Sequence, residues 1–186
     1  MSETPYVLDV FIETSKNSKV KYEYDSDYSC MRCEKIYFEP IPFNYGFIPN
    51  TEKDDSPLDV IILSEIPFNS HTIIEARIIG LFNSYKTIDL DEFNKIKQVN
   101  EIKQIQIIIC VPVNSITFDY NKIKDIRDID TSILNKISNF WSNSNDFVFK
   151  NAEEGLKLYK KNIITEDDDI TNEDTYNIID ISDCPI

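Results

Sequence analysis

Short apolar segments with the patterns of β-strands fill the N-terminal part of the chain. YVLDVFI at 6–12 is apolar and β-branched, and KVKYEYD at 19–25 alternates between polar and apolar residues. Three more apolar runs predict buried strands: PLDVIILSE at 57–65, TIIEARIIGLF at 72–82 and QIQIIICVPV at 104–113. Many strands therefore precede any strong helical pattern.

Helical patterns gather near the C-terminal end. In the segment 130–144 Ile133, Ile137 and Trp141 fall at four-residue spacing, with Asp130 or Thr131 as a suitable N-cap. The segment NAEEGLKLYKK at 151–161 predicts a second helix. Strands first and helices last predict a mainly β, α+β domain, in its simplest form a small barrel with helices against its side.

Two polar regions interrupt this pattern. The stretch 83–104 is charged and predicts a short helix around 91–98. Before it, prolines and aromatic residues across 34–50 exclude helix and favour extended segments with turns. The last region, 165–186, is acidic, and we expect a tail that is mobile or docks through 176–181. We thus predict one domain, 1–164, followed by an acidic tail.

Charge narrows the range of partners. The chain has 186 residues, 33 of them acidic and 19 basic, with a formal net charge of -14. Such a surface repels phosphate backbones and acidic membranes, which argues against nucleic acid and membrane as partners. The sequence has no signal-peptide pattern and no apolar run long enough to cross a bilayer, so we expect a cytoplasmic protein.

Histidine and cysteine offer little chemistry. His71 is the only histidine, which excludes histidine clusters for zinc and makes a surface role the simpler interpretation. Cys30 and Cys33 have the C-x-x-C spacing of a zinc or dithiol site. A zinc site needs a second pair, whereas Cys110 and Cys184 are isolated, so we expect reduced thiols without a metal.

Carboxylates are the more informative group. Glu13 and Glu23 end the first two predicted strands, and Lys21 lies two residues before Glu23 on the same strand face. Three aspartates crowd the segment 54–59. Mg²⁺ takes oxygen ligands and commonly bridges carboxylates to phosphate, so this set suits a phosphate site. A solvated acidic loop is the competing interpretation.

The order of several motifs resembles the soluble family I inorganic pyrophosphatases. The motifs are FIET, KVKYEYD, NYGFIPNT, PLDVIIL, RIIGLF, CVPV and NKIKDIRDID with the helix that follows it. The resemblance covers roughly 9–161 and is densest over NYGFIPNT. It implies a five-stranded OB-like β-barrel flanked by C-terminal helices, a dimer or hexamer, and Mg²⁺-dependent hydrolysis of pyrophosphate.

The resemblance also assigns site residues. By position, Glu13 and Glu23 match acidic residues of the metal site, Lys21 matches a phosphate-binding lysine, and Tyr45 matches the tyrosine that hydrogen-bonds phosphate. Arg32 lies one position from the place of the family's phosphate-binding arginine.

Other family positions are replaced. The family loop reads D-x-D-P-x-D, and with Pro57 as the fixed point Asp54 and Asp59 match its two metal ligands. Ser56 then stands where the family has the aspartate that activates water.

The acidic loop before the V-P strand differs as well. An alignment without gaps puts Ile105 and Ile107 at the places of a metal-binding aspartate and a lysine. Glu101 and Lys103 reproduce an acid-x-lysine pair but need a shift of four residues, and Asn100 is the nearest residue for another missing aspartate. Near the later helix, the family's Tyr-Lys pair is replaced by Ser144 and Asn145.

Several replacements together would remove several charge-stabilising groups. The sequence therefore favours a pyrophosphatase-fold protein with a degenerate site, weakly active or inactive, that binds partners through its acidic tail. The alternative is a divergent, active Mg²⁺-dependent diphosphatase whose site is rebuilt around residues such as Asp54, Asp59, Glu13 and Glu101. Nucleic-acid binding through the barrel is the weakest of the three hypotheses, because it needs a basic face.

Overall fold

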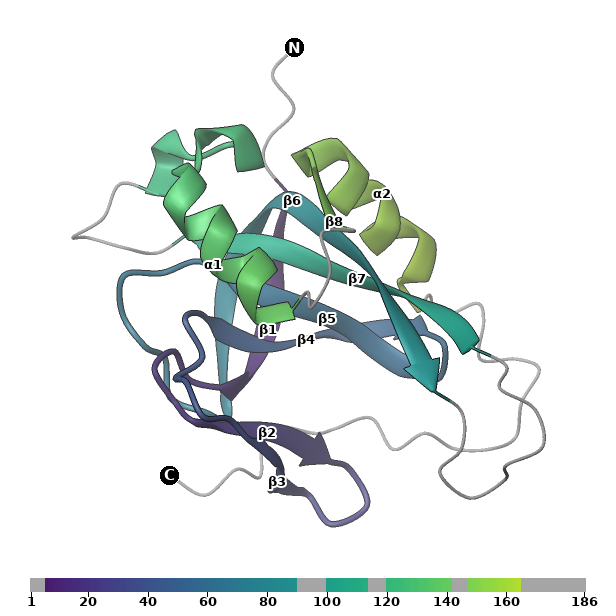
Figure 1. Cartoon of the computed structure of the whole chain (residues 1–186). Helices are drawn as coiled ribbons and strands as arrows, with labels where there is room; N and C mark the ends of the chain where they lie inside the picture. Colours follow the sequence, from purple (N-terminus) through teal and green to yellow (C-terminus); the bar gives the residue numbers. More distant parts are fainter. Residues whose placement is uncertain (1–5, 90–99, 114–119, 142–146, 165–186) are drawn as a thin grey trace.

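Five strands close into a barrel in the computed structural model, which describes residues 6–89, 100–113, 120–141 and 147–164 (Figure 1). The order is β1-β4-β5-β7-β6, and β6 pairs back with β1. Among the described strands only β5 and β7 pair in parallel. The bounds are Val7–Thr14 for β1, Asn44–Lys53 for β4, Ser56–Ile62 for β5, Thr72–Asp89 for β6 and Asn100–Pro112 for β7.

Smaller elements surround the barrel. A separate hairpin of β2 (Val20–Asp25) and β3 (Cys30–Ile36) lies at one end, while β8 (Phe147–Lys150) extends the sheet beside β6 (Figure 1). Two helices, α1 (Thr131–Trp141) and α2 (Ala152–Asn162), lie against the outside of the barrel. Two single turns of 3₁₀-helix precede α1, at Tyr120–Lys122 and Ile126–Asp128. The predicted fold, a mainly β barrel with helices at its side, is confirmed.

Two apolar cores hold these layers together. The barrel interior contains side chains from every barrel strand, and α2 closes it through Tyr159; its fully buried members include Val10, Ile12, Val60, Ala76 and Ile108. The second core lies on the outer face, under α1. It joins the strands to the helix through residues that include Phe43, Tyr45, Ile61, Ile107 and Ile137.

The NYG motif has a structural reason at each of its first and third positions. Asn44 is fully buried, and its side chain accepts hydrogen bonds from the backbone of Lys16 at 2.9 Å and Phe68 at 2.8 Å. It also donates to the carbonyl oxygen of Ile66 at 3.0 Å. A Cβ on Gly46 would lie 1.8 Å from the carbonyl oxygen of Phe11, so only glycine lets β1 and β4 approach here.

The two predicted helices form close to their expected limits. The Asp130 carboxylate accepts from the backbone of Ser132 at 2.7 Å before α1, and Asn151 caps α2 by accepting from Glu154 at 3.1 Å. On α1 the predicted apolar face is confirmed in part, since Ile137 is 1 % exposed whereas Ile133 is 38 % exposed.

The sheet extends further than the sequence pattern indicates. No strand was predicted at β3 or β8, and β6 and β7 continue into the polar stretch that the pattern assigned to other structure. Tertiary pairing explains this, because each of the two long strands satisfies the other's backbone groups up to the Asp89–Asn100 pair. The predicted helix at 91–98 and the acidic tail lie outside the described residues.

The cysteines and the lengths of the helices bear on two further predictions. Within the described part of the chain, Cys30, Cys33 and Cys110 are free thiols, the first two exposed and the third buried. None of the described helices is long and apolar enough to span a membrane.

Candidate active site

The predicted acidic residues meet on the outer face of the barrel, where β1, β4 and β5 are covered in part by the β2–β3 hairpin. Phe11 pairs with Phe47, and Phe47 pairs with Asp59, so one row of side chains crosses the three strands. Glu13 and Tyr45 lie two residues further along this same face. The face therefore brings Glu13, Tyr45 and Asp59 together.

A β-bulge sets the position of Glu13. The register of β1 against β4 shifts between Ile12 and Thr14, which leaves Glu13 as the extra residue. Its side chain is 7 % exposed, and its Oε1 accepts from the backbone of Tyr24 on the hairpin at 2.8 Å.

Burial raises the pKa of Glu13 to about 7, and this desolvation outweighs the Tyr24 hydrogen bond and the positive charge of Lys21. The nearby carboxylates of Asp59 and Glu23 raise it further. The site thus holds a carboxyl group that exchanges its proton near neutral pH.

Asp59 combines an exposed side chain with a desolvated carboxyl group. Its side chain is exposed, yet the atoms crowded around its carboxyl raise its pKa through desolvation. The two observations agree if the carboxylate contacts water on one side and protein on the others. The Tyr45 hydroxyl, within hydrogen-bonding reach, and the charge of Lys21 act in the opposite direction and favour the carboxylate.

Tyr45 and Lys21 complete the polar cluster. Tyr45 is 3 % exposed, and burial raises its pKa well above its usual range, so its hydroxyl stays protonated and able to donate. The Lys21 Nζ lies 5.0 Å from the centre of the Tyr45 ring. Lys21 also forms an ion pair with Glu34 of β3.

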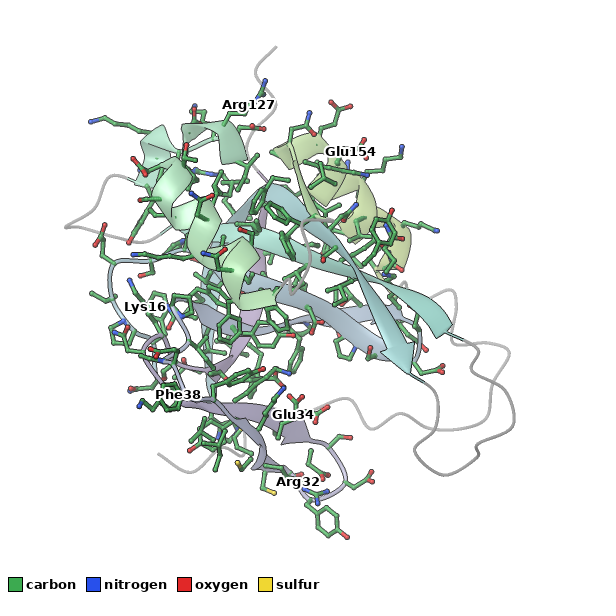
Figure 2. The ribbon with its side chains drawn as sticks, viewed as in Figure 1. Lys16, Arg32, Glu34, Phe38, Arg127 and Glu154 are labelled. Carbon is green, nitrogen blue, oxygen red and sulfur yellow. The ribbon has the colours of Figure 1, made fainter. Side chains whose placement is uncertain are left out.

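Two residues of β3 that the sequence did not single out face this cluster. Lys21 pairs with Lys35 but Tyr22 pairs with Cys33, so Glu34 is an extra residue in β3. At such a bulge two consecutive side chains lie on nearly the same side. Figure 2 shows Glu34 on the side of the hairpin that faces the barrel. Lys35, directly opposite Lys21, therefore adds a second lysine to this face.

Arg32 and Glu23 lie further out on the hairpin. Arg32 has a side chain 65 % exposed and pairs with Asp25 at 2.8 Å, which lowers the pKa of that carboxyl. It lies near the tip of the hairpin, away from the barrel (Figure 2). Glu23 is opposite Arg32 and exposed, although its charge still reaches Glu13. Lys35 is thus better placed than Arg32 to face the cluster.

The structure does not bring Asp54 to Asp59. Asp54 and Asp55 form the two-residue turn between β4 and β5, with φ of 53° and 63°, as in type I′ hairpins. The Asp54 side chain is 73 % exposed and lies 4.0 Å from the Lys53 Nζ. Ser56 is exposed, and its hydroxyl donates to the Lys53 carbonyl oxygen at 3.2 Å. Three residues of strand, roughly 10 Å, separate Ser56 from Asp59.

Buried and partly buried apolar side chains continue the site toward β7. The register that pairs Val60 with Ile108 sets Asp59 beside Ile107, which is fully buried. Ile105 is partly buried on the same face. Glu101 belongs to β7 but lies six residues from Ile107, roughly 20 Å along the strand. Ser144 and Asn145 are outside the described residues.

Comparison with known proteins decides the family. The family model described as inorganic pyrophosphatase matches residues 10–166. The chain belongs to the inorganic pyrophosphatase family.

Relatives and solved structures agree with this assignment. An inorganic pyrophosphatase of Saccharolobus solfataricus is 33% identical over 142 residues, which cover 75% of this chain and 74% of that protein. One from Helicobacter pylori is 29% identical over 168 residues, covering 84% and 89%. A solved H. pylori pyrophosphatase structure superimposes with a TM-score of 0.69 at 26% identity, and one from Ehrlichia chaffeensis with 0.66 at 30%. These structures cover 88% and 87% of this chain and are themselves covered to 97% and 96%.

The carboxylate oxygens of this pyrophosphatase-family site are ligands of the type that Mg²⁺ prefers. Among the described residues no three acidic, histidine or cysteine side chains converge on one point. Mg²⁺ does not need such a cage, because it is commonly bound through one or two carboxylates together with water and phosphate oxygens. Asp59 fits that use, and the negative charge of Glu13 lies close to it.

Proposed function

We propose that this chain is a Mg²⁺-dependent inorganic diphosphatase that hydrolyses pyrophosphate to two phosphates. The observation that carries the proposal is the joint position of Glu13, Asp59, Lys21 and Tyr45 on one barrel face. The relatives described above, all named inorganic pyrophosphatases, support the active alternative over the degenerate site that the sequence favoured.

Each member of the cluster has a distinct task. Lys21 and Lys35 offer positive charge to phosphate oxygens from the hairpin side, and the Tyr45 hydroxyl donates a hydrogen bond beside them. Asp59 would hold Mg²⁺ together with water and phosphate oxygens. When bound, the ion neutralises phosphate charge and acidifies the attacking water.

Glu13 is the residue best suited to move a proton. Its Oε1 is occupied by the Tyr24 backbone, and its pKa of about 7 lets Oε2 accept or release a proton at neutral pH. We assign it this role in place of Ser56, which has no acidic side chain and lies at the turn. Asp54, Glu23 and Glu101 would act at most as outer groups in this arrangement.

Phosphate release from pyrophosphate in the presence of Mg²⁺ tests the proposal. Asp59→Asn keeps the shape of the side chain and removes its charge, so we expect a loss of at least about a hundredfold in rate. Asp9→Asn is the matched control, because Asp9 is an exposed aspartate at the far end of β1. Wild-type protein without turnover, or a mutant as fast as wild type, would contradict the proposal.

A second function, non-catalytic binding of phosphates, is favoured by one observation. The β7 residue beside Asp59 is Ile107, a buried apolar side chain at a place where a charged group would stabilise a reaction. Calorimetry with methylenediphosphonate, which resists hydrolysis, distinguishes the two functions. Tight binding without any pyrophosphate turnover would select the binding function.

The assembly and the partners remain predictions. Light scattering measures the dimer or hexamer that the family resemblance implies. A truncation at 164 compared with the whole chain tests whether the acidic tail binds another protein.

A further inference from the structure

Half-buried aromatic side chains border the polar cluster on the side of α1. Tyr37, which follows β3, lies 4.9 Å from Phe140 between ring centres, and Phe140 lies 5.5 Å from Trp141. Trp141 in turn lies 5.4 Å from Tyr45. We call Tyr37, Phe140 and Trp141 the aromatic wall; each keeps part of its surface exposed.

One lysine contacts Tyr37 of this wall, and another contacts Tyr45, the neighbour of Trp141. Lys35 Nζ is 5.1 Å from the centre of the Tyr37 ring, and Lys21 Nζ is 5.0 Å from that of Tyr45. The two lysines are also cross-strand partners in the hairpin. A ligand with phosphate on the lysines would therefore extend directly over aromatic side chains.

Positive charge around the site is concentrated on the side of the hairpin and β4. The positive charges that act on Asp59 come from Lys21 of the hairpin and Lys53 of β4. On the β7 and α1 side the described Ile105 and Trp141 are partly buried and offer apolar and planar surface, with Ile107 fully buried beneath them. A second bare phosphate placed there would lose its hydration without gaining a cation, whereas an uncharged ring would gain contact area.

We propose that this site also binds a nucleoside 5′-diphosphate, with its phosphates on Lys21 and Lys35 and its base against the aromatic wall. Aromatic side chains accept bases by stacking, irrespective of sequence, and lysines hold the attached phosphates. The inference rests on the proposed function in one respect, because it assigns the phosphates to the same Mg²⁺-loaded cluster. It adds a class of ligand larger than pyrophosphate.

Trp141 reports the binding directly, since it is the only tryptophan in the chain. We titrate its fluorescence in Mg²⁺ with three probes: ADP, methylenediphosphonate, which lacks a base, and adenosine, which lacks phosphate. We expect ADP to bind roughly tenfold more tightly than either of the others, because it uses both the wall and the lysines. Equal affinities of ADP and methylenediphosphonate would overturn the proposal.

Two variants locate the base. Phe140→Leu keeps apolar volume under α1 but removes the ring, and it should weaken ADP about tenfold while methylenediphosphonate binds unchanged. Tyr37→Ala removes the ring that contacts Lys35, and it should also weaken ADP about tenfold. The control is Phe38→Ala, whose ring is 89% exposed and outside the wall. Unchanged ADP affinity in both wall variants would overturn the proposal even if ADP binds.

Pyrophosphate turnover separates the two proposals. ADP binding that depends on Phe140 in a protein without turnover supports this inference and contradicts the diphosphatase. Turnover of pyrophosphate without ADP binding supports the diphosphatase and contradicts this inference.

Discussion

The hairpin side and the β7 side of the site differ although one barrel face carries both. On the hairpin side Lys21, Glu13 and Tyr45 are polar and close together, and the charge of Lys21 acts on Glu13. On the β7 side Ile107 is fully buried and belongs to the core under α1. The first side is built for ligand charge and the second for packing. Activity and stability should therefore depend on different sides of the same site.

Removing the lysine of the polar side should have the largest effect. Lys21→Met keeps the length of the stem and removes the charge that faces Asp59, so we expect the rate of pyrophosphate hydrolysis to fall at least about a hundredfold. Lys19→Met, an exposed lysine two residues away, provides the control. A fall of less than tenfold for Lys21→Met would show that the polar side is not where phosphate binds.

A substitution on the apolar β7 side should lower the stability of the protein more than its activity. Ile107→Ala leaves a cavity under α1, and we expect it to lower the free energy of unfolding by about 3 kcal/mol. The rate per folded molecule should change only a few times, because Ile107 is buried beneath the site surface. Urea unfolding followed by Trp141 fluorescence gives the first quantity and a phosphate assay the second. A large rate loss without a stability loss would contradict this division.

Glu13 on the polar side should make the stability of the protein depend on pH. Its folded pKa of about 7 exceeds the ordinary 4.5, so the folded protein binds this proton more tightly than the unfolded chain. The resulting stabilisation is complete below about pH 4.5 and is lost as pH rises through 7, up to about 3 kcal/mol in the metal-free protein. Glu13→Gln keeps the acceptor for Tyr24 and should flatten this dependence. Urea unfolding at several pH values measures it, and equal slopes in both proteins would refute the assignment.

Ser56 should matter least. Ser56→Asp restores the acidic residue that the family has at this position, but here the residue lies in the β4–β5 turn region. We expect a rate change of less than about threefold, roughly 0.7 kcal/mol. An increase above tenfold would mean that this turn reaches the reacting phosphate. It would also mean that Ser56 in place of the family's aspartate weakens the wild-type site, as the degenerate-site interpretation holds.

Much of this fold could be predicted from the sequence, but less of the site. Alternating and β-branched runs determine β1, β2, β5 and the centres of β6 and β7, because the pleat itself produces that pattern. The bulges at Glu13 and Glu34 have no local signature. They determine which side chains share a face, which is why the sequence pattern did not indicate that Lys35 lies on the same face as Lys21. The register of β2 against β3 is needed to show that Lys35 lies opposite Lys21.

The buried amide of Asn44 has a consequence for motion. It holds the backbone of Lys16 on one loop and of Phe68 and Ile66 on another, so neither loop can leave without breaking a bond to the same side chain. Hydrogen exchange should therefore find the amides of Lys16 and Phe68 opening together, at one shared rate that Asn44→Ala increases for both.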